Sequence, residues 1–369
     1  MQTDSSTRRL MSKKILVFMI IMLALTACQV TPGPKVIDLP TVIPEEVPTA
    51  APSPMVVSPT STPPEPTTDL GSVSAPQMLR EASVAFPYWV IWSQDGQRLI
   101  VSSEGSVTVF NPDTLDPVAT RSFQTPARLL DFSPDGATLA YTPDGQTIEL
   151  ENIDSGQILQ TILPEAGFQQ ASFSPDGKTL AVDSTAQMAF TLWDVATGQK
   201  GRVLSGFVTA APIYSGDFSP SGKKFIWWAR GTIQVMDIVT GALAETINHQ
   251  DFITGFSLNQ ADTLLATAAG GNFKDEFTPL IYLWNPESGE QIAAYPQDKF
   301  ASALAFSPDG STLAAAIAGD VLLLDPANGQ VVQKIHASDE AVNSLAFSPD
   351  GALLATAASD GYIRLWRLK

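Results

Sequence analysis

The chain contains a unit that recurs about every 40 residues, and this repeat limits the folds that it can adopt. The last copy reads Ala-Phe-Ser-Pro-Asp-Gly-Ala-Leu-Leu-Ala at 346–355, Ser-Asp-Gly at 359–361 and Tyr-Ile-Arg-Leu-Trp at 362–366. It holds three short apolar runs with alternating side chains, separated by two turns. In the first turn Pro presets φ and Gly takes a left-handed conformation, as in a short hairpin loop. The unit therefore predicts an antiparallel meander rather than a helix.

Six further copies precede this one. The aromatic residues that introduce the first turn are Trp92, Phe132, Phe173, Phe218, Phe256, Phe306 and Phe347. The fifth copy departs from the pattern, since Ser-Leu-Asn-Gln-Ala-Asp at 257–262 contains no Gly, and we expect a looser turn there. A period near 40 residues with about four strands per copy predicts one blade of a β-propeller per copy.

The repeats fill residues 77–369 and leave no room for a second globular domain. We therefore expect an all-β fold, a seven-bladed β-propeller with four antiparallel strands per blade and a core of layers between neighbouring blades. The seventh copy stops after its third strand, whereas residues 77–83 have the pattern of a fourth strand. We predict that residues 77–83 pair with residues 362–368 and close the ring, which removes an exposed sheet edge.

Residues 1–28 have the composition of an export signal. Two lysines precede an apolar run, which ends in Leu-Thr-Ala-Cys at 25–28. This end resembles the lipobox of bacterial lipoproteins, a resemblance that implies lipid attachment at Cys28. Cleavage of a plain secretory signal near Ala27, or retention of an uncleaved anchor, stays open as the alternative. Cys28 is the only cysteine of the chain, so no disulfide framework competes for it.

Residues 29–76 have the composition of a tether. The segment contains twelve prolines and seven threonines but no Phe, Tyr or Trp. Such a segment buries too little apolar surface to offset its ordering entropy, so we expect it to be disordered and extended. With lipid on Cys28, the chain would be held in the cell envelope on the extracytoplasmic side, at the cell surface or in the periplasm.

The formal net charge of the chain is −17, and four bases and one acid fall within residues 1–28. The rest of the chain therefore carries a charge near −20 (−17 − 3). So acidic a surface argues against nucleic acid or anionic lipid as a binding partner. We expect a monomeric domain whose partner is a protein or a cell-envelope polymer.

The repeated turn, the strand ending in Leu-Trp-Asp and the Thr-Gly that follows it resemble the WD-repeat β-propeller family across residues 77–369. The clearest copies are Leu-Trp-Asp-Val-Ala-Thr-Gly at 192–198 and Leu-Trp-Asn-Pro-Glu-Ser-Gly at 283–289. The two histidines, His249 and His336, lie near the position of a structural histidine in that family. The resemblance implies one buried polar network of His336, Asp360 and Trp366 inside the seventh blade.

The sequence contains no recognisable catalytic arrangement. Two distant histidines and one cysteine provide neither a His-rich metal centre nor a cysteine nucleophile, and we predict no cofactor and no metal. The Asp-Gly pairs lack the dense acidic spacing of a calcium loop. We therefore favour a non-catalytic binding scaffold. A propeller hydrolase of lactonase-like or glycan-active type, with channel carboxylates and a divalent cation, is the alternative.

Aromatic residues in the loops that precede the first strands are candidates for partner binding. On the face that carries these loops we select Phe86 and Tyr88, together with Phe273, Lys274 and Phe277 from the longest insertion, at 269–279. Phe168, Tyr214 and Phe252 are expected to pack between blades instead. The Trp227-Trp228 pair lies on one strand, so we expect one ring on each side of its blade.

Overall fold

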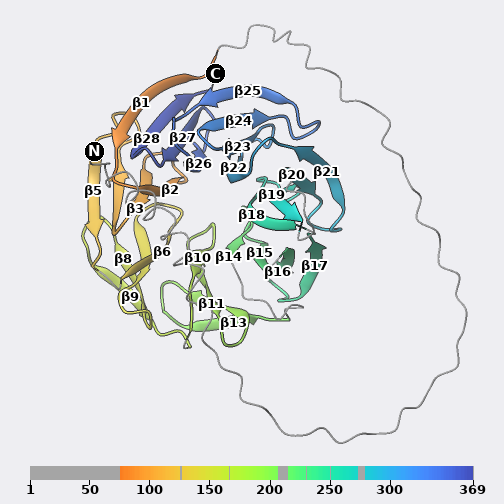
Figure 1. Cartoon of the computed structure of the whole chain (residues 1–369). Coiled ribbons are helices and arrows are strands. Elements are labelled where there is room, and N and C mark those ends of the chain that lie inside the picture. Colours follow the sequence, from red (N-terminus) through yellow and green to blue (C-terminus); the bar gives the residue numbers. More distant parts are fainter. Residues whose placement is uncertain are drawn as a thin grey trace, which may run out of the picture. The chain divides into compact units, whose positions relative to one another are not determined.

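A computed structural model describes residues 75–124, 127–165, 167–206, 215–229, 231–249, 251–272 and 279–368. These residues lie within one compact unit, Asp69–Lys369. Their regular elements are β-strands, grouped into seven four-stranded antiparallel sheets. Figure 1 shows the sheets arranged around a ring, with β14 and β18 near its axis and β1 and β25 at its outside. The expected seven-bladed β-propeller is confirmed.

The first three blades follow one another along the chain. Blade 1 consists of β2 (Pro87–Trp92), β3 (Leu99–Ser103), β4 (Ser106–Phe110) and β5 (Pro117–Ser122). Blade 2 consists of β6 (Arg128–Phe132), β7 (Thr138–Thr142), β8 (Ile148–Asn152) and β9 (Ile158–Ile162). Blade 3 consists of β10 (Ala171–Phe173), β11 (Thr179–Ser184), β12 (Ala189–Asp194) and β13 (Lys200–Leu204).

The next three blades have the same order of strands from the axis outward. Blade 4 consists of β14 (Ser215–Phe218), β15 (Lys224–Ala229), β16 (Thr232–Asp237) and β17 (Leu243–Asn248). Blade 5 consists of β18 (Asp251–Leu258), β19 (Leu265–Asn272), β20 (Leu280–Trp284) and β21 (Gln291–Pro296). Blade 6 consists of β22 (Ala301–Phe306), β23 (Leu313–Ile317), β24 (Asp320–Leu324) and β25 (Val331–His336).

Blade 7 combines both ends of the propeller. Its sheet has the order β1 (Gln77–Ser83), β28 (Tyr362–Arg367), β27 (Leu353–Ala358) and β26 (Val342–Phe347). Strand β1 pairs with β28 from Gln77 opposite Arg367 to Ser83 opposite Tyr362. The half-buried Arg364 of β28 strengthens this pairing, because its Nε lies 3.2 Å from the Glu81 carboxylate of β1. The predicted closure of the ring by residues 77–83 is confirmed.

The core lies between the blades. Among the described residues, seven clusters of buried apolar side chains form, each shared by two neighbouring blades. Phe168 is buried between blades 2 and 3, as expected. Trp227 belongs to the cluster between blades 3 and 4, whereas Trp228 packs against the cluster between blades 4 and 5, so the two rings do face opposite sides. Burial on both faces of each blade explains the nearly continuous apolar runs of the middle strands.

The Ser-Pro-Asp-Gly turns join the first and second strands of a blade and contact the neighbouring blade at one face of the ring, which we call the bottom face. In blade 7 the Ser348 hydroxyl donates to Asp350 at 2.5 Å and accepts from the Leu353 N–H at 2.9 Å. The turn glycines have φ between +66° and +72°, a conformation that other residues rarely adopt. A Cβ added at Gly96, Gly177, Gly222 or Gly351 would meet the proline of the preceding blade at 3.5–3.7 Å. Each of these four glycines therefore lies against a proline ring of the neighbouring blade.

The fifth turn is not looser than the others, contrary to expectation. The Asp262 N–H donates to the Asn259 carbonyl at 3.0 Å, as the Gly310 N–H does to Ser307 in blade 6. Asp262 itself adopts φ +56°, and the Asn259 side chain accepts from the N–H groups of Thr263 and Leu264. Asn and Asp tolerate the conformations that Ser and Gly have elsewhere. Leu258, rather than Phe256, consequently occupies the position before this turn.

The part of the chain that the structure describes contains no helix long and apolar enough to cross a membrane.

Candidate functional site

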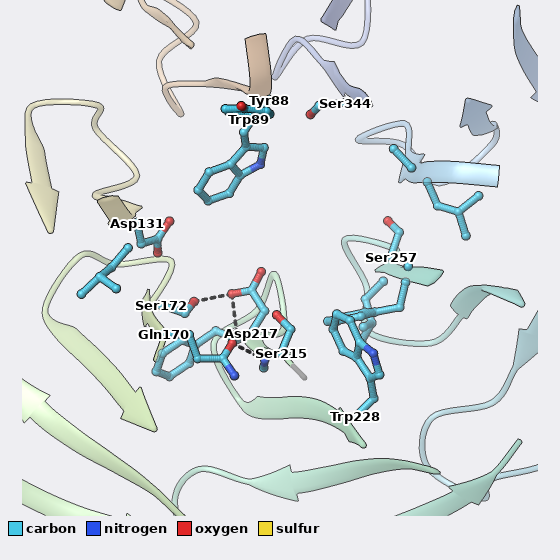
Figure 2. Close-up of a pocket in the computed structure, with 18 of the residues that line it drawn as sticks. Tyr88, Trp89, Asp131, Gln170, Ser172, Ser215, Asp217, Trp228, Ser257 and Ser344 are labelled. Atoms are coloured by element: carbon cyan, nitrogen blue, oxygen red, sulfur yellow. Dashed lines mark hydrogen bonds between the residues drawn. The ribbon is translucent and has the colours of Figure 1, made fainter. Parts of the chain in front are cut away.

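The first strands of the seven blades surround an axial channel with a volume of about 690 Å³. One part of its wall is polar and comes from blades 2 to 4, with Asp131, Gln170, Ser172, Ser215 and Asp217. Figure 2 shows these side chains grouped on one side of the channel, with the Trp89 ring and the Trp228 ring on other sides. The channel therefore has two carboxylates on one side and two tryptophan rings on other sides.

Side chains of the channel wall bond the unpaired edges of neighbouring first strands. The Phe173 N–H of blade 3 donates to Asp131 of blade 2 at 2.6 Å, and the Phe306 N–H of blade 6 donates to Ser257 of blade 5 at 3.2 Å. Between blades 7 and 1, the Val90 N–H donates to the Ser344 hydroxyl at 3.2 Å. A first strand has no strand neighbour toward the axis, so these bonds satisfy donors that would otherwise be unpaired.

The two channel aspartates differ in how far they face solvent. Asp217 is exposed to the channel and accepts from the Ser172 hydroxyl at 2.5 Å, whereas Asp131 is only partly exposed. Enclosure among the blades raises the pKa of Asp131 well above its usual range, and the charge of Asp217 raises it further. Enclosure also raises the pKa of Asp217, although the hydrogen bond from Ser172 opposes this. Both changes have the sign expected for carboxylates removed from bulk water.

A second hollow, of about 420 Å³, lies between blades 1 and 2 and shares Tyr88 and Trp89 with the channel. It is on the face opposite the bottom face, which we call the top face, because the loops before the first strands and the β3–β4 hairpin meet there. Phe123 and Leu130 give it apolar walls. Partial burial raises the pKa of Tyr88, and the nearby Glu104 carboxylate adds to this, so its phenol stays neutral.

Phe86 and Tyr88, which we selected from the sequence, lie at the top face of blade 1 and are 62% and 55% exposed. Phe86 has φ +50°, a left-handed conformation that is uncommon for a large residue. Phe273, Lys274 and Phe277, and likewise Cys28 and Tyr214, lie outside the described residues. The side chain of Phe252 is also outside the description. The sequence therefore placed one exposed aromatic cluster correctly on this face.

The polar network expected around His336 is not formed. The side chain of His336 is 65% exposed and lies 2.9 Å from Asp320, whose hydrogen bond raises the pKa of His336, with a smaller contribution from Asp339. Asp360 accepts from the Ser338 hydroxyl at 2.9 Å, and the Trp366 indole N–H donates separately to Thr356 at 3.0 Å. His336 ends β25 beside the buried Ile335, and alternation along the strand turns it outward.

The network occurs instead around His249 in blade 5. The buried His249 ring lies 2.8 Å from the Thr267 hydroxyl, which also accepts from the Trp284 indole N–H at 2.9 Å. The backbone N–H of His249 donates to the Gly231 carbonyl, as the backbone N–H of Ala337 donates to the Gly319 carbonyl. Ala337, the residue after His336, therefore occupies the histidine position in blade 7. The sequence prediction was one residue out of register, which is enough to reverse the face of a strand.

The channel aspartates Asp131 and Asp217 were not selected from the sequence. Asp131 and Asp217 each lie one residue before the phenylalanine that introduces a Ser-Pro turn. The equivalent residue is Ala305 in blade 6 and Ala346 in blade 7. An acidic residue inside a short apolar strand was the available signal. No group of three or more His, Cys, Asp or Glu side chains suited to a metal ion occurs within the described residues.

Comparison with known proteins agrees with this architecture. The WD40 family, described as WD domain, G-beta repeat, matches residues 329–367. This match spans all of β25, β26, β27 and β28. No curated protein sequence matches the chain. The matched repeat lies within a ring of seven four-stranded blades, and the match and the ring together support the WD-repeat β-propeller family for this chain.

Proposed function

We propose that this protein is a non-catalytic interaction scaffold that is anchored in the cell envelope by lipid on Cys28 and binds a protein partner through its top face. The observation that carries the proposal is the exposed pair Phe86 and Tyr88 beside the hollow between blades 1 and 2. Aromatic residues on a rigid scaffold offer a large contact area at a small cost in conformational entropy. WD-repeat propellers in general bind other proteins, which supports the same reading.

The residues that line the hollow indicate which kind of partner segment would fit it. Its walls are largely apolar, with one acid, Glu104, and one base, Arg128, at its margins. A partner segment with one or two apolar side chains would replace water there, and its polar groups could pair with Glu104 and Arg128 at the rim. An interface of this type has an apolar centre and a polar margin.

A capture experiment tests the partner-binding face. The purified full chain would be incubated with extract of its own cell envelope and compared with a Phe86→Ser, Tyr88→Ser double variant. Leu163→Ser is the matched control, because Leu163 is 70% exposed in the loop between β9 and β10, outside the hollow. We expect one stoichiometric partner, retained by the control and lost by the double variant. Equal retention by all three proteins would exclude this face.

The anchor is tested separately by fractionation. Residues 25–28 and the Pro- and Thr-rich segment 29–76 support lipid attachment followed by a spacer. Cys28→Ser should abolish labelling by radioactive palmitate and move the protein out of the membrane fraction. Unchanged labelling would contradict the anchor without bearing on the binding face.

A further inference from the structure

The axial channel has the size of a small-molecule site. Its volume of about 690 Å³ is within the range of roughly 300–1,000 Å³ that is usual for ligand pockets. Its wall includes residues from all seven blades, so a ligand inside it would be surrounded by rigid first strands. The scaffold role proposed above uses the hollow between blades 1 and 2 and leaves the channel without an assignment.

The aromatic part of the wall comes from Trp89 and Trp228. Trp89 is 38% exposed although it lies on a first strand, and Figure 2 shows its ring extending into the open space. Its ring centroid is 5.8 Å from that of Phe132, and the two rings are inclined at 49°. The Trp228 ring is held edge-on by Phe256 at 4.9 Å. Two supported tryptophans thus present apolar surface toward the channel.

The polar part of the wall offers both acceptors and donors. Within the described residues, the Ser172 hydroxyl and the Phe218 N–H both donate to Oδ1 of Asp217, which leaves Oδ2 as an acceptor, and Asp131 accepts from the Phe173 N–H through Oδ2. Gln170 accepts from the Gly216 N–H through Oε1, which directs its amide NH₂ toward other partners. The Ser257 and Ser344 hydroxyls accept from backbone N–H groups and keep their own hydrogen to donate.

We propose that the axial channel binds a saccharide, either a neutral sugar or an amino sugar. A sugar ring has an apolar C–H face, which an indole can cover, and hydroxyl groups that donate to carboxylates and accept from amides and hydroxyls. The wall of the channel presents all three of these features. The inference goes beyond the protein-binding role, because it assigns a ligand to the axial channel, which shares only Tyr88, Trp89 and Leu130 with the hollow between blades 1 and 2.

The charges of the wall exclude other ligand classes. The residues that line the channel include two aspartates but no Lys, Arg or His, so an acidic sugar or a phosphate would meet repulsion without a counter-charge. A simple cation would use the two carboxylates but would leave the donors Gln170, Ser257 and Ser344 without an acceptor. A sugar hydroxyl can satisfy both kinds of group.

Saturation-transfer NMR and tryptophan fluorescence with the purified full chain test the proposal. The probes are cellobiose, N,N′-diacetylchitobiose and glucosamine, with glucuronate and acetyl-lysine amide as counter-probes. We expect saturable binding of at least one of the first three sugars. Trp89→Leu and Asp217→Asn should each lower the association constant about tenfold or more, as loss of an aromatic anchor or a charged acceptor does.

Two controls match these variants. Tyr362→Leu removes an aromatic ring that is 37% exposed on β28, and Asp113→Asn removes an exposed carboxylate outside the channel. Both should leave the association constant unchanged within about twofold. The proposal is overturned if none of the three sugars binds, if only acetyl-lysine amide or glucuronate binds, or if sugar binding survives in both channel variants. Asp217→Asn conserves shape, so a folding defect of Trp89→Leu alone would not hide the result.

Discussion

Blades 3 and 7 have the same four-stranded shape but different polar interactions. In blade 7 the Trp366 indole N–H donates to Thr356 of the adjacent strand. In blade 3 the corresponding Trp193 is buried, and its indole N–H has no hydrogen-bond partner among the described residues. The strand pairing explains the difference. In blade 7, Thr356 lies two residues after Leu354, which pairs with Trp366. The equivalent residue in blade 3, two residues after Leu180, the partner of Trp193, is Val182. Valine has no oxygen that could accept the indole N–H.

The comparison shows that the interactions that determine the fold of a blade differ from those that add to its stability. Apolar packing and the Ser-Pro-Asp-Gly turn are sufficient to build blade 3, because its four strands pair as those of blade 7 do. The Thr–Trp bond is an additional contribution, made in blades 5 and 7 and missing in blade 3. The family match at residues 329–367 falls on a blade that makes the bond. Individual blades can therefore differ in stability without a change of fold.

Blade 7 also differs because its fourth strand comes from the other end of the propeller, and removal of that strand should have the largest effect. Deletion of Gln77–Ser83 from the full chain breaks the β1–β28 ladder and the Glu81–Arg364 pair. A loss of about 3–5 kcal/mol is expected from several hydrogen bonds of about 1 kcal/mol each. We expect the melting temperature to fall by about 10 °C. Calorimetry that gave the same melting temperature would show that closure contributes nothing.

Thr356→Val tests the polar network of blade 7 while conserving shape. The variant leaves the buried Trp366 N–H without its acceptor, which should cost about 1–3 kcal/mol. Urea denaturation monitored by fluorescence measures the change. Thr138→Val is the control, because Thr138 lies half-buried at the start of β7 and its hydroxyl makes no bond within the described residues. Equal effects of both substitutions would attribute the loss to threonine itself rather than to the bond.

Val182→Thr is the reciprocal change in blade 3. A hydroxyl at this position can accept from the Trp193 N–H, as Thr267 accepts from Trp284 in blade 5. We expect a gain of about 1 kcal/mol, which corresponds to a rise of about 2 °C in melting temperature. Combining the substitution with Trp193→Phe, which removes the donor, should abolish the gain. A gain that persisted in the combined variant would have another cause.

The smallest expected effect is the pH dependence of stability that Asp217, on the first strand of blade 4, produces. Because enclosure raises the pKa of Asp217, the folded state binds its proton more tightly than the unfolded state does. Stability is therefore lost as pH rises from about 4, the unfolded pKa, through the folded pKa. Asp217→Asn should melt slightly above the wild type at pH 7 and equally near pH 4. Melting curves between pH 4 and pH 8 test this, with Asp113→Asn as an exposed control. Parallel curves for all three proteins would contradict it.

The fold could be predicted because its determinants are local and repeated. Each Ser-Pro-Asp-Gly turn combines a side-chain acceptor, a fixed φ and a left-handed glycine within four residues, and these properties are legible from residue types. The closing strand was legible as well, since the pattern of residues 77–83 matches the fourth strands and the seventh copy lacks one. The tight turn of blade 5 was not predicted, because Asn259 and Asp262 fulfil there the roles that Ser and Gly have in the other turns.

The candidate site was less predictable because it depends on contacts between blades. The sequence indicated exposed aromatics at Phe86, just before β2, and at Tyr88, at the start of β2, since the position of a strand end follows from the order of strands. It did not indicate that Asp131 and Asp217, 86 residues apart (217 − 131), face one channel. The His336 prediction went wrong for a related reason. Strand alternation assigns opposite faces to neighbouring residues, so an error of one position reverses the result.

The closing strand also has a mechanical consequence. Strand β1 is the first strand after segment 29–76, and it belongs to the sheet of blade 7 although the chain continues from it into blade 1. A pulling force along the segment before Gln77 would therefore load the β1–β28 ladder and the Glu81–Arg364 pair before any other sheet. The junction that completes the ring would be the first to yield under tension, so it would set the load that the propeller bears if it is anchored through this segment, as we propose.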